Sequence, residues 1–405
     1  MVRRIFHDML LRRHFWRYAT FSEVAELYVS RMLRMAALYL VNAFVSVYMY
    51  QMGYSLSIIA FVWAIFYIFK VFVTLLLARF IAWIGPKHAI LVSNLLYIPA
   101  MILFANVDGG GFGLLIPALL LQGLSASLYA VAYSIDFSKV KNVQHAGKEI
   151  AYMNIFEKVT TGLSPVVGGF LAYWFGPHVI ILLAAVLFAF AAMPLLKTGE
   201  QVQRNQRLKF VGFPWRLLFR HATAQFAYGF DVFVSGTAWS LYVAVFIIGM
   251  SSGNKVYATT GLLTSVVLVV AIFASYTYGK IIDRNKGKQL MNAATVMNAI
   301  THLVRPFVQT TVPVAGLNAA NELATTGYLL PYTRAVFDNA DISGARVTYL
   351  GFTEVIANIG AALGAVILGF LLLVFESQTA FQAFFFVGAA VSLLILTARF
   401  PLYKK

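Results

Sequence analysis

Runs of about twenty apolar residues recur along this chain and constrain its fold more than any other feature of the sequence. A helix of that length crosses roughly 30 Å of hydrocarbon, whereas the strands of a transmembrane barrel would alternate in polarity. We therefore predict an all-helical integral membrane protein with twelve transmembrane segments. The expected segments are residues 20–50, 55–80, 87–106, 113–137, 149–175, 177–196, 220–248, 256–279, 288–310, 313–336, 345–375 and 379–400.

The distribution of charge supports a membrane location and orients the chain. Only 11% of the residues are charged, against about a quarter in soluble domains. If the first segment enters from the cytoplasm, most of the 31 Lys and Arg residues lie in cytoplasmic loops, and Lys255 alone lies in the opposite loops. The positive-inside rule then places both termini in the cytoplasm. Nucleic-acid binding is not expected despite a net charge of +16, because the basic residues are spread over every inner loop.

An internal repeat divides the chain. The stretch GKEIAYMNIFEKV at 147–159 is echoed by GARVTYLGFTEVI at 344–356, a displacement of 197 positions. Further matches occur in order along the chain, so two homologous halves are indicated. We predict a six-helix bundle over 1–196, a cytoplasmic linker over 197–219 and a second, pseudo-symmetric six-helix bundle over 220–405. The matched residues are Gly147 with Gly344, Tyr152 with Tyr349, Glu157 with Glu354, Tyr129 with Tyr328, and Tyr133 with Tyr332.

Short motifs make the chain similar to a known family. Gly279, Asp283, Arg284 and Gly287 resemble the loop signature Gly-x-x-x-Asp-Arg-x-Gly of the major facilitator superfamily, with one extra residue. The equivalent loop of the first half departs from it, and Leu119 replaces the arginine of the family's Arg-x-x-Gln-Gly motif. Pro165, Gly168 and Gly169 are similar to a motif associated with antiporters, but Ser164 replaces its first glycine.

The resemblance covers essentially all of the chain and implies a secondary transporter that works by alternating access. It also implies that the first and fourth segments of each half line a central cavity. The four motif residues from Gly279 to Gly287 would help to close the cytoplasmic side. Glu157 and Glu354 lie on helix faces that carry small residues, and such faces pack closely against neighbouring helices. We therefore expect these two glutamates to act in structure or gating rather than in substrate contact.

Polar stripes at helical spacing occur in the same four segments without reference to any family. A charged side chain near the bilayer centre costs roughly 2.5 to 3.5 kcal/mol, so each is a functional candidate. Glu23, Glu26, Ser30 and Arg34 form a stripe in the first segment, with Arg31 and Asn42 to one side. We predict substrate binding by Arg31, Arg34, Gln122, Tyr129, Tyr133, Tyr228, Asp231, Ser235, Trp239, Tyr242, Asn321, Tyr328 and Tyr332. For each tyrosine, packing or anchoring at the membrane interface is the alternative.

Three carboxylates are candidates for proton coupling, namely Asp231, Glu322 and Glu26. Removal from water disfavours the charged form of a carboxylate, which makes proton binding possible. Arg31 and Arg34 are expected to be partners of Asp231 or Glu322, and the alternative is a permanent ion pair that only holds helices together.

Two further cations lie within predicted segments. Lys70 is deep in the second segment and needs an acid nearby, for which Glu157 or Glu26 is expected. Arg305 is near the outer end of the ninth segment and is expected to extend its head to the membrane surface.

The function that these features favour is proton-coupled export of a small amphipathic or cationic molecule, because acids and aromatic faces suit cations. Alternatives are a symporter of a sugar, amino acid or organic ion, a lipid flippase, and a membrane receptor without transport. An enzyme is not expected, because no His, Asp and Ser constellation lies at membrane depth. We also expect no cofactor and no metal site, because cysteine is absent and the seven histidines form no cluster. We expect a monomer in a plasma membrane, favouring a prokaryotic inner membrane because there is no long central loop.

Overall fold

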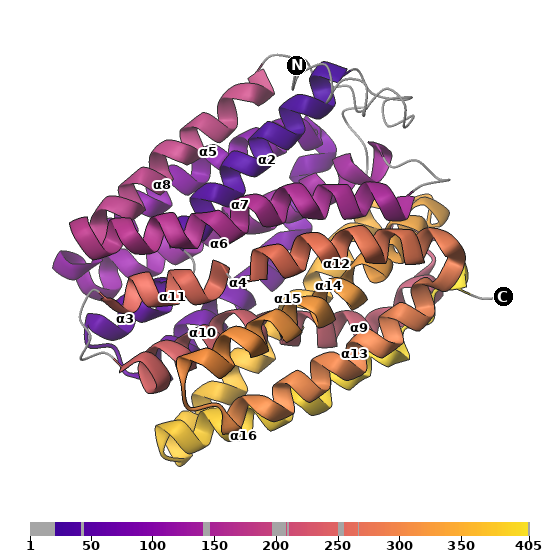
Figure 1. The fold of residues 1–405 in the computed structure, drawn as a ribbon. Coiled ribbons are helices and arrows are strands. Elements are labelled where there is room, and N and C mark those ends of the chain that lie inside the picture. The colour runs from indigo at the N-terminus through magenta and orange to yellow at the C-terminus, as the bar shows by residue number, and fades with distance from the viewer. Residues whose placement is uncertain are drawn as a thin grey trace, which may run out of the picture.

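The computed structural model of this protein describes residues 21–41, 44–140, 146–196, 208, 210–249, 255–265 and 267–403. Its described secondary structure consists of helices, and the long ones form one bundle (Figure 1). In the first part of the chain these are α2 (Phe21–Val41), α3 (Val45–Gln51), α4 (Leu56–Ile84), α5 (Pro86–Ala105), α6 (Val107–Val140), α7 (Ala146–Phe175) and α8 (Pro177–Ala192), followed by the 3₁₀ turn η1 (Met193–Leu196).

The second part contains α-helices interrupted by π-helical and 3₁₀ turns. Its α-helices are α9 (Trp215–Val232), α10 (Trp239–Tyr242), α11 (Lys255–Ser265), α12 (Val267–Ile281), α13 (Gly287–Val304), α14 (Thr311–Ile342), α15 (Arg346–Val374) and α16 (Ser377–Ser392). The π-helical turns are η2 (Phe233–Ala238), η3 (Val243–Gly249) and η5 (Ile282–Lys286), and the 3₁₀ turns are η6 (Arg305–Phe307), η7 (Leu393–Thr397) and η8 (Pro401–Tyr403).

Helix boundaries follow from local sequence. The side chain of Ser55 accepts a hydrogen bond from the Ile58 amide and so caps the start of α4. Gly85 has φ of +94°, which a residue with a side chain rarely adopts, and Pro86 follows it in the first turn of α5. This Gly-Pro pair turns the chain sharply between two long helices.

Nine stretches of the described residues are long and apolar enough to cross a membrane, fewer than the twelve expected segments. One of them, Lys255–Phe307, covers two expected segments. The other difference concerns α7 and α14, which are helical over the expected ranges but are too polar to count as spans. Helices that face other helices and an internal cavity tolerate such polarity, because their polar side chains are shielded from lipid.

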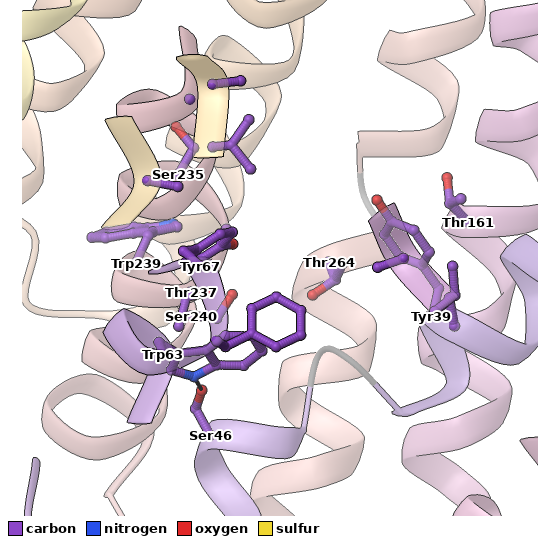
Figure 2. A pocket seen from close by; sticks show the side chains of 18 of the residues that line it. Tyr39, Ser46, Trp63, Tyr67, Thr161, Ser235, Thr237, Trp239, Ser240 and Thr264 are labelled. Carbon is purple, nitrogen blue, oxygen red and sulfur yellow. Dashed lines mark hydrogen bonds between the residues drawn. The ribbon is translucent and has the colours of Figure 1, made fainter. Parts of the chain in front are cut away.

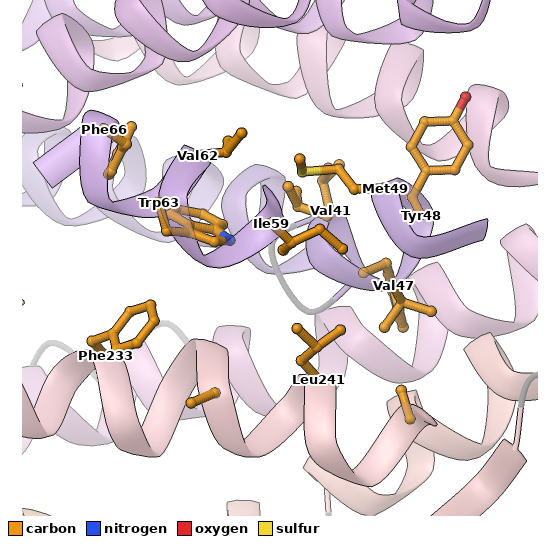
Figure 3. Close-up of a cluster of buried hydrophobic side chains, with 14 of the residues drawn as sticks. Val41, Val47, Tyr48, Met49, Ile59, Val62, Trp63, Phe66, Phe233 and Leu241 are labelled. Atoms are coloured by element: carbon orange, nitrogen blue, oxygen red, sulfur yellow. The ribbon is translucent and has the colours of Figure 1, made fainter. Parts of the chain in front are cut away.

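The apolar core forms two clusters of buried side chains. Figure 3 shows part of one, in which Ile59 and Trp63 of α4 lie opposite Phe233 of η2 and Leu241 of α10. The other cluster contains Ile81, Leu128 and Tyr349 among its members. Along their helices, the buried residues Lys70 and Asp231 each fall between members of one cluster and members of the other.

Glycines bring the two parts of the chain into backbone contact. A Cβ at Gly261 of α11 would lie 2.2 Å from the carbonyl oxygen of Pro165 in α7, and one at Gly169 of α7 would lie 2.5 Å from that of Tyr257 in α11. Close approach of this kind needs residues without side chains. With α4 packed along α15, and α7 along α11 and α12, these crossings form the walls around the internal space described next.

Candidate functional site

A cavity of about 560 Å³ lies inside the bundle. Small-molecule sites commonly have volumes of 300 to 1,000 Å³, so the cavity is large enough for a metabolite or a drug-sized molecule. In Figure 2, Tyr39 and Thr161 face Trp63 and Tyr67 across this space. Its wall combines aromatic rings with charged and amide side chains, and the charged residues are Arg34, Lys70, Lys158, Glu322 and Glu354.

Arg34 of α2 is the centre of a polar group that contains no acid, which we call the Arg34 cluster (Arg34, Ser93, Asn94, Ser125 and Tyr129). Its Nη1 donates to Asn94 Oδ1 at 2.6 Å and its Nη2 donates to Ser125 Oγ at 3.1 Å. The guanidinium carbon lies 4.0 Å from the centre of the Tyr129 ring, a cation–π contact. None of the described carboxylates forms an ion pair with Arg34, and its buried Nε has no acceptor. The cluster therefore presents a positive charge to the cavity.

Both carboxylate oxygens of Asp231 in α9 accept hydrogen bonds within a second group, the Asp231 cluster (Asp231, Asn298, His302, Arg305 and Tyr328). Oδ1 lies 2.6 Å from His302 Nε2 and accepts from Asn298 Nδ2 at 3.0 Å. Oδ2 accepts from the Tyr328 hydroxyl at 2.5 Å. Asp231 and Tyr328 are each 2% exposed and His302 is fully buried. These bonds join α9, α13 and α14 behind the cavity wall.

Arg305 connects the Asp231 cluster to the cavity. Its Nη1 lies 2.8 Å from His302 Nδ1, and its Nη2 donates to Asn321 Oδ1 at 3.0 Å and to Ser235 Oγ at 3.4 Å. Asn321 and Ser235 line the cavity, whereas Arg305 does not. The Arg305 guanidinium also lies 5.0 Å from the centre of the Trp239 ring, which forms part of the cavity wall.

Both acids among the described cavity-lining residues are paired with lysines. Glu322 Oε1 of α14 lies 2.8 Å from Lys158 Nζ of α7, and Glu354 Oε1 of α15 lies 3.5 Å from Lys70 Nζ of α4. Each pair joins one helix of the first part of the chain to one helix of the second. Within each pair the two charges cancel, so Arg34 remains as the excess charge of the wall.

The sequence profile of the Major Facilitator Superfamily matches residues 27–251, more than half of the chain. The chain belongs to this superfamily. The predicted family is thus confirmed, and with it an integral membrane protein of a transporter family. No curated protein sequence is significantly similar to the chain.

Solved structures of superfamily transporters share the fold. The human organic anion transporter TETRAN matches with a TM-score of 0.67 and 13% identity, over 93% of this chain and 100% of that one. A bacterial homologue of the iron transporter ferroportin in an outward-facing state matches with a TM-score of 0.65 and 16% identity, over 92% of this chain and 97% of that one. The Escherichia coli fucose:proton symporter matches with a TM-score of 0.62 and 15% identity, and the match also covers 92% of this chain and 97% of that one. At such identities the likeness shows the fold and leaves the substrate open.

The cavity of this superfamily member gathers part of the predicted substrate site. The predicted residues that line it are Arg34, Gln122, Tyr129, Tyr228, Ser235, Trp239 and Asn321. Those that do not line it are Arg31, Tyr133, Asp231, Tyr242, Tyr328 and Tyr332. Among the proton-coupling candidates, Glu322 lines the cavity, Asp231 is one layer behind it, and Glu26 is buried with Lys87 at 3.0 Å. The side chain of Glu23, and Asn42 as a whole, lie outside the described part of the chain.

Three predicted contacts are wrong in this structure. Arg31 pairs with Glu157 at 2.5 Å rather than with Asp231 or Glu322, because α7 lies beside α2. Arg34 has neither acid as a partner. Lys70 pairs with Glu354, and neither Glu157 nor Glu26 is its partner, because α4 packs along α15.

The prediction that Arg305 reaches the membrane surface is also wrong, since the residue is completely buried. The α-helix α13 ends at Val304, and the 3₁₀ turn that follows directs Arg305 towards Asp231 and Asn321. A signal for this group is present in the sequence. Asn298, His302 and Arg305 follow one another at helical spacing, but the ninth segment is not one of the four in which polar stripes were predicted.

Some of the residues that were predicted to bind substrate pack against, or hydrogen-bond to, other side chains of the protein and do not line the cavity. Tyr242 packs against Phe381 and Phe385, and the Tyr332 hydroxyl donates to Gln225 at 2.8 Å. Tyr133 stacks on Tyr129, and the Arg31 guanidinium lies 3.7 Å from the centre of its ring. These contacts agree with the packing alternative for the tyrosines.

The loop signature forms the junction of α12, η5 and α13. Asp283 Oδ1 lies 3.8 Å from Arg334 Nη1 of α14, and a Cβ at Gly287 would lie 2.9 Å from the Tyr403 hydroxyl. Gly279 is buried at the end of α12, and Arg284 is exposed. These contacts tie the junction to α14 and to the last described turn, and its role in gating stays a prediction. Within the described residues, no group of three or more metal-ligating side chains occurs.

Proposed function

We propose that this protein transports a small amphipathic molecule that carries an anionic group, by alternating access and in exchange with, or together with, protons. The observation that carries the proposal is the unpaired charge of Arg34 on the cavity wall. A buried cation without an acid is costly, and an anion in the cavity would supply the missing charge. Aromatic rings around the cavity, among them Trp63, Tyr67 and Trp239, suit the apolar part of such a molecule.

The charges of the cavity favour an anion over the cation that the sequence suggested. Glu322 and Glu354 would be the sites for a cation, but each is already bound to a lysine. An incoming cation would have to displace Lys158 or Lys70, whereas an anion meets a free charge. One of the structural relatives is an organic anion transporter, although fold likeness alone carries no substrate. Export, the direction that the sequence favours, stays a prediction for a flux assay.

A ligand comparison tests the proposal. The probes are 2-naphthoate, its neutral amide 2-naphthamide and the cation 2-naphthylmethylammonium, which share one apolar ring system. We expect 2-naphthoate to raise the melting temperature of the purified protein in detergent, because a ligand at 100 times its Kd stabilises by about 2.7 kcal/mol. The amide and the cation should have little effect.

Substitutions at one position complete the test. Arg34→Met should abolish the shift with 2-naphthoate, and Arg34→Lys should retain part of it, since lysine keeps the charge but not the planar fork. Arg346→Met is the matched control, because Arg346 pairs with Asp341 and does not line the cavity. Stronger binding of the cation than of the carboxylate, or full binding by Arg34→Met, would refute the proposal. A flux assay in proteoliposomes separates a transporter from a receptor that only binds.

A further inference from the structure

The bonding of His302 fixes where its proton lies. A guanidinium group only donates hydrogen bonds, so His302 Nδ1, at 2.8 Å from Arg305 Nη1, must accept. The ring proton is therefore on Nε2 and points to Asp231 Oδ1 at 2.6 Å. In this state His302 is neutral, Arg305 is positive and Asp231 is negative, so the Asp231 cluster has no net charge. The lone pair of His302 Nδ1 faces the positive charge of Arg305.

Protonation at His302 breaks fewer bonds than protonation at Asp231. The carboxylate of Asp231 accepts from His302, Asn298, Ser235 and Tyr328, and a proton on it would compete with these donors. A proton on His302 Nδ1 leaves all four bonds intact and strengthens the pair with Asp231. It disrupts only the contact with Arg305, because two N–H donors would then face each other.

The geometry points to His302 Nδ1 as the binding site of a proton whose arrival drives Arg305 from the imidazole towards the cavity wall. Arg305 already donates to Asn321 and Ser235, both of which line the cavity. Moving the guanidinium in that direction adds positive charge to the wall. This inference rests on the proposed transport of an anion and deepens it, because proton and anion would then bind cooperatively.

The neighbours of His302 leave few other groups to respond to pH. Asp231 of α9, Tyr328 of α14 and Arg305 of η6 face it directly. On α14, Glu322 is turned to Lys158, and α16 and η7 contain no titratable side chain. On α12, Tyr278 packs near Gly327 and Ala294, two turns away. The charged residues of η5 lie at the far end of α13, roughly 24 Å or more from His302 along the helix.

Tryptophan fluorescence can report the movement without any substrate. The Arg305 guanidinium lies 5.0 Å from the centre of the Trp239 ring, so its displacement should change the emission of Trp239. For the wild-type protein in detergent we expect a reversible emission change on acidification. Trp239→Phe should lack that change, which assigns the signal to this residue among the six tryptophans.

Two buried histidines provide a matched pair of variants. His302→Gln keeps an acceptor for Arg305 and a donor for Asp231 but cannot take a proton, so the emission change should disappear. His221→Gln is the control, because His221 is buried between the hydroxyls of Tyr332 and Tyr349 and has no charged partner among its described contacts. It should leave the change intact. A full emission change in His302→Gln, or its loss in His221→Gln alone, would overturn the inference.

Binding of 2-naphthoate at two pH values then tests the link to the cavity. We expect wild-type affinity to rise by roughly tenfold on acidification, a typical coupling between two sites, and His302→Gln to bind equally at both pH values. Affinity that falls on acidification, or a rise that persists in His302→Gln, would contradict the coupling. If the carboxylate does not bind but the emission change follows His302, the proposed function fails and the proton site stands.

Discussion

The Arg34 cluster and the Asp231 cluster occupy comparable positions but handle charge differently. Each lies between three helices, α2, α5 and α6 in one case and α9, α13 and α14 in the other. Each contains a fully buried arginine held by amide and hydroxyl groups. The Arg34 cluster has no acid, whereas in the Asp231 cluster the charge of Asp231 compensates that of Arg305, and His302 lies between them. The same scaffold thus holds a constant charge on one side and a charge that a proton can alter on the other.

The largest effect is expected from removing the acid of the Asp231 cluster. Asp231→Asn leaves Arg305 buried without a countercharge, and breaking such a pair costs about 3 to 5 kcal/mol. We expect a clear fall in the melting temperature in detergent, measured with a thiol-independent dye or by circular dichroism. Arg305→Met in the same background should restore much of the loss, since it removes the unpaired charge. Unchanged stability of Asp231→Asn would show that the two clusters do not differ in this way.

The reciprocal change gives the Arg34 cluster an acid. Asn94→Asp places a carboxylate at the position that now lies 2.6 Å from Arg34 Nη1. The charge of Arg34 would then be neutralised within the protein, and we expect the Kd for 2-naphthoate to rise about ten- to a hundredfold, as for the loss of one charged contact. Calorimetric titration measures the change. Asn94→Ser removes the same acceptor without adding charge and should weaken binding far less.

Removing the acid from either glutamate–lysine pair of the cavity wall should strengthen the binding of 2-naphthoate, by less than Asn94→Asp weakens it. Glu322→Gln and Glu354→Gln each free one lysine and add positive charge to the cavity wall. Since Glu354 and Lys158 are each about a quarter exposed, the gain is limited, and we expect the affinity for 2-naphthoate to rise about two- to fivefold. The same titration decides. Weaker binding of the anion by both variants would argue that the acids, and not Arg34, set the charge preference.

The smallest effect is expected at Tyr129, where ring and hydroxyl can be separated. Tyr129→Phe keeps the ring over Arg34 and loses only a hydrogen bond from Arg31 at 3.3 Å, so binding should change by less than about twofold. Tyr129→Ala removes the cation–π contact, worth about 0.5 to 2 kcal/mol, and should weaken binding more. Equal losses in the two variants would assign the contribution to the hydroxyl instead.

Helical spacing predicted which faces carry the polar residues, but not what each residue touches. The polar faces of the first and fourth segments meet, as the contact of Arg34 with Tyr129 shows, and those of the seventh and tenth meet at Asp231 and Tyr328. Spacing along one helix cannot choose partners on another. For this reason the sequence pointed to Glu157 or Glu26 as the partner of Lys70, although Glu354 is its partner.

Arg305 shows a second limit of the sequence. Its position near the end of an apolar segment is equally consistent with a side chain that reaches the membrane surface and one that turns inward. The decision depends on Asp231, which is 74 positions away in the sequence, and on the direction of a single 3₁₀ turn. A buried countercharge outweighs the access to water that an exposed arginine would have.

The sequence by itself determined the membrane-embedded helical architecture, the family and the faces on which polar side chains gather, because these follow from local hydropathy and helical periodicity. Only the tertiary structure decided that Arg34 has no acid, that both acids of the described cavity wall are bound to lysines, and that His302 stands between Asp231 and Arg305. The physical reason is that the energy of a buried charge depends on the distance to its counterion across helices. That distance is a property of the packing and has no period in the sequence.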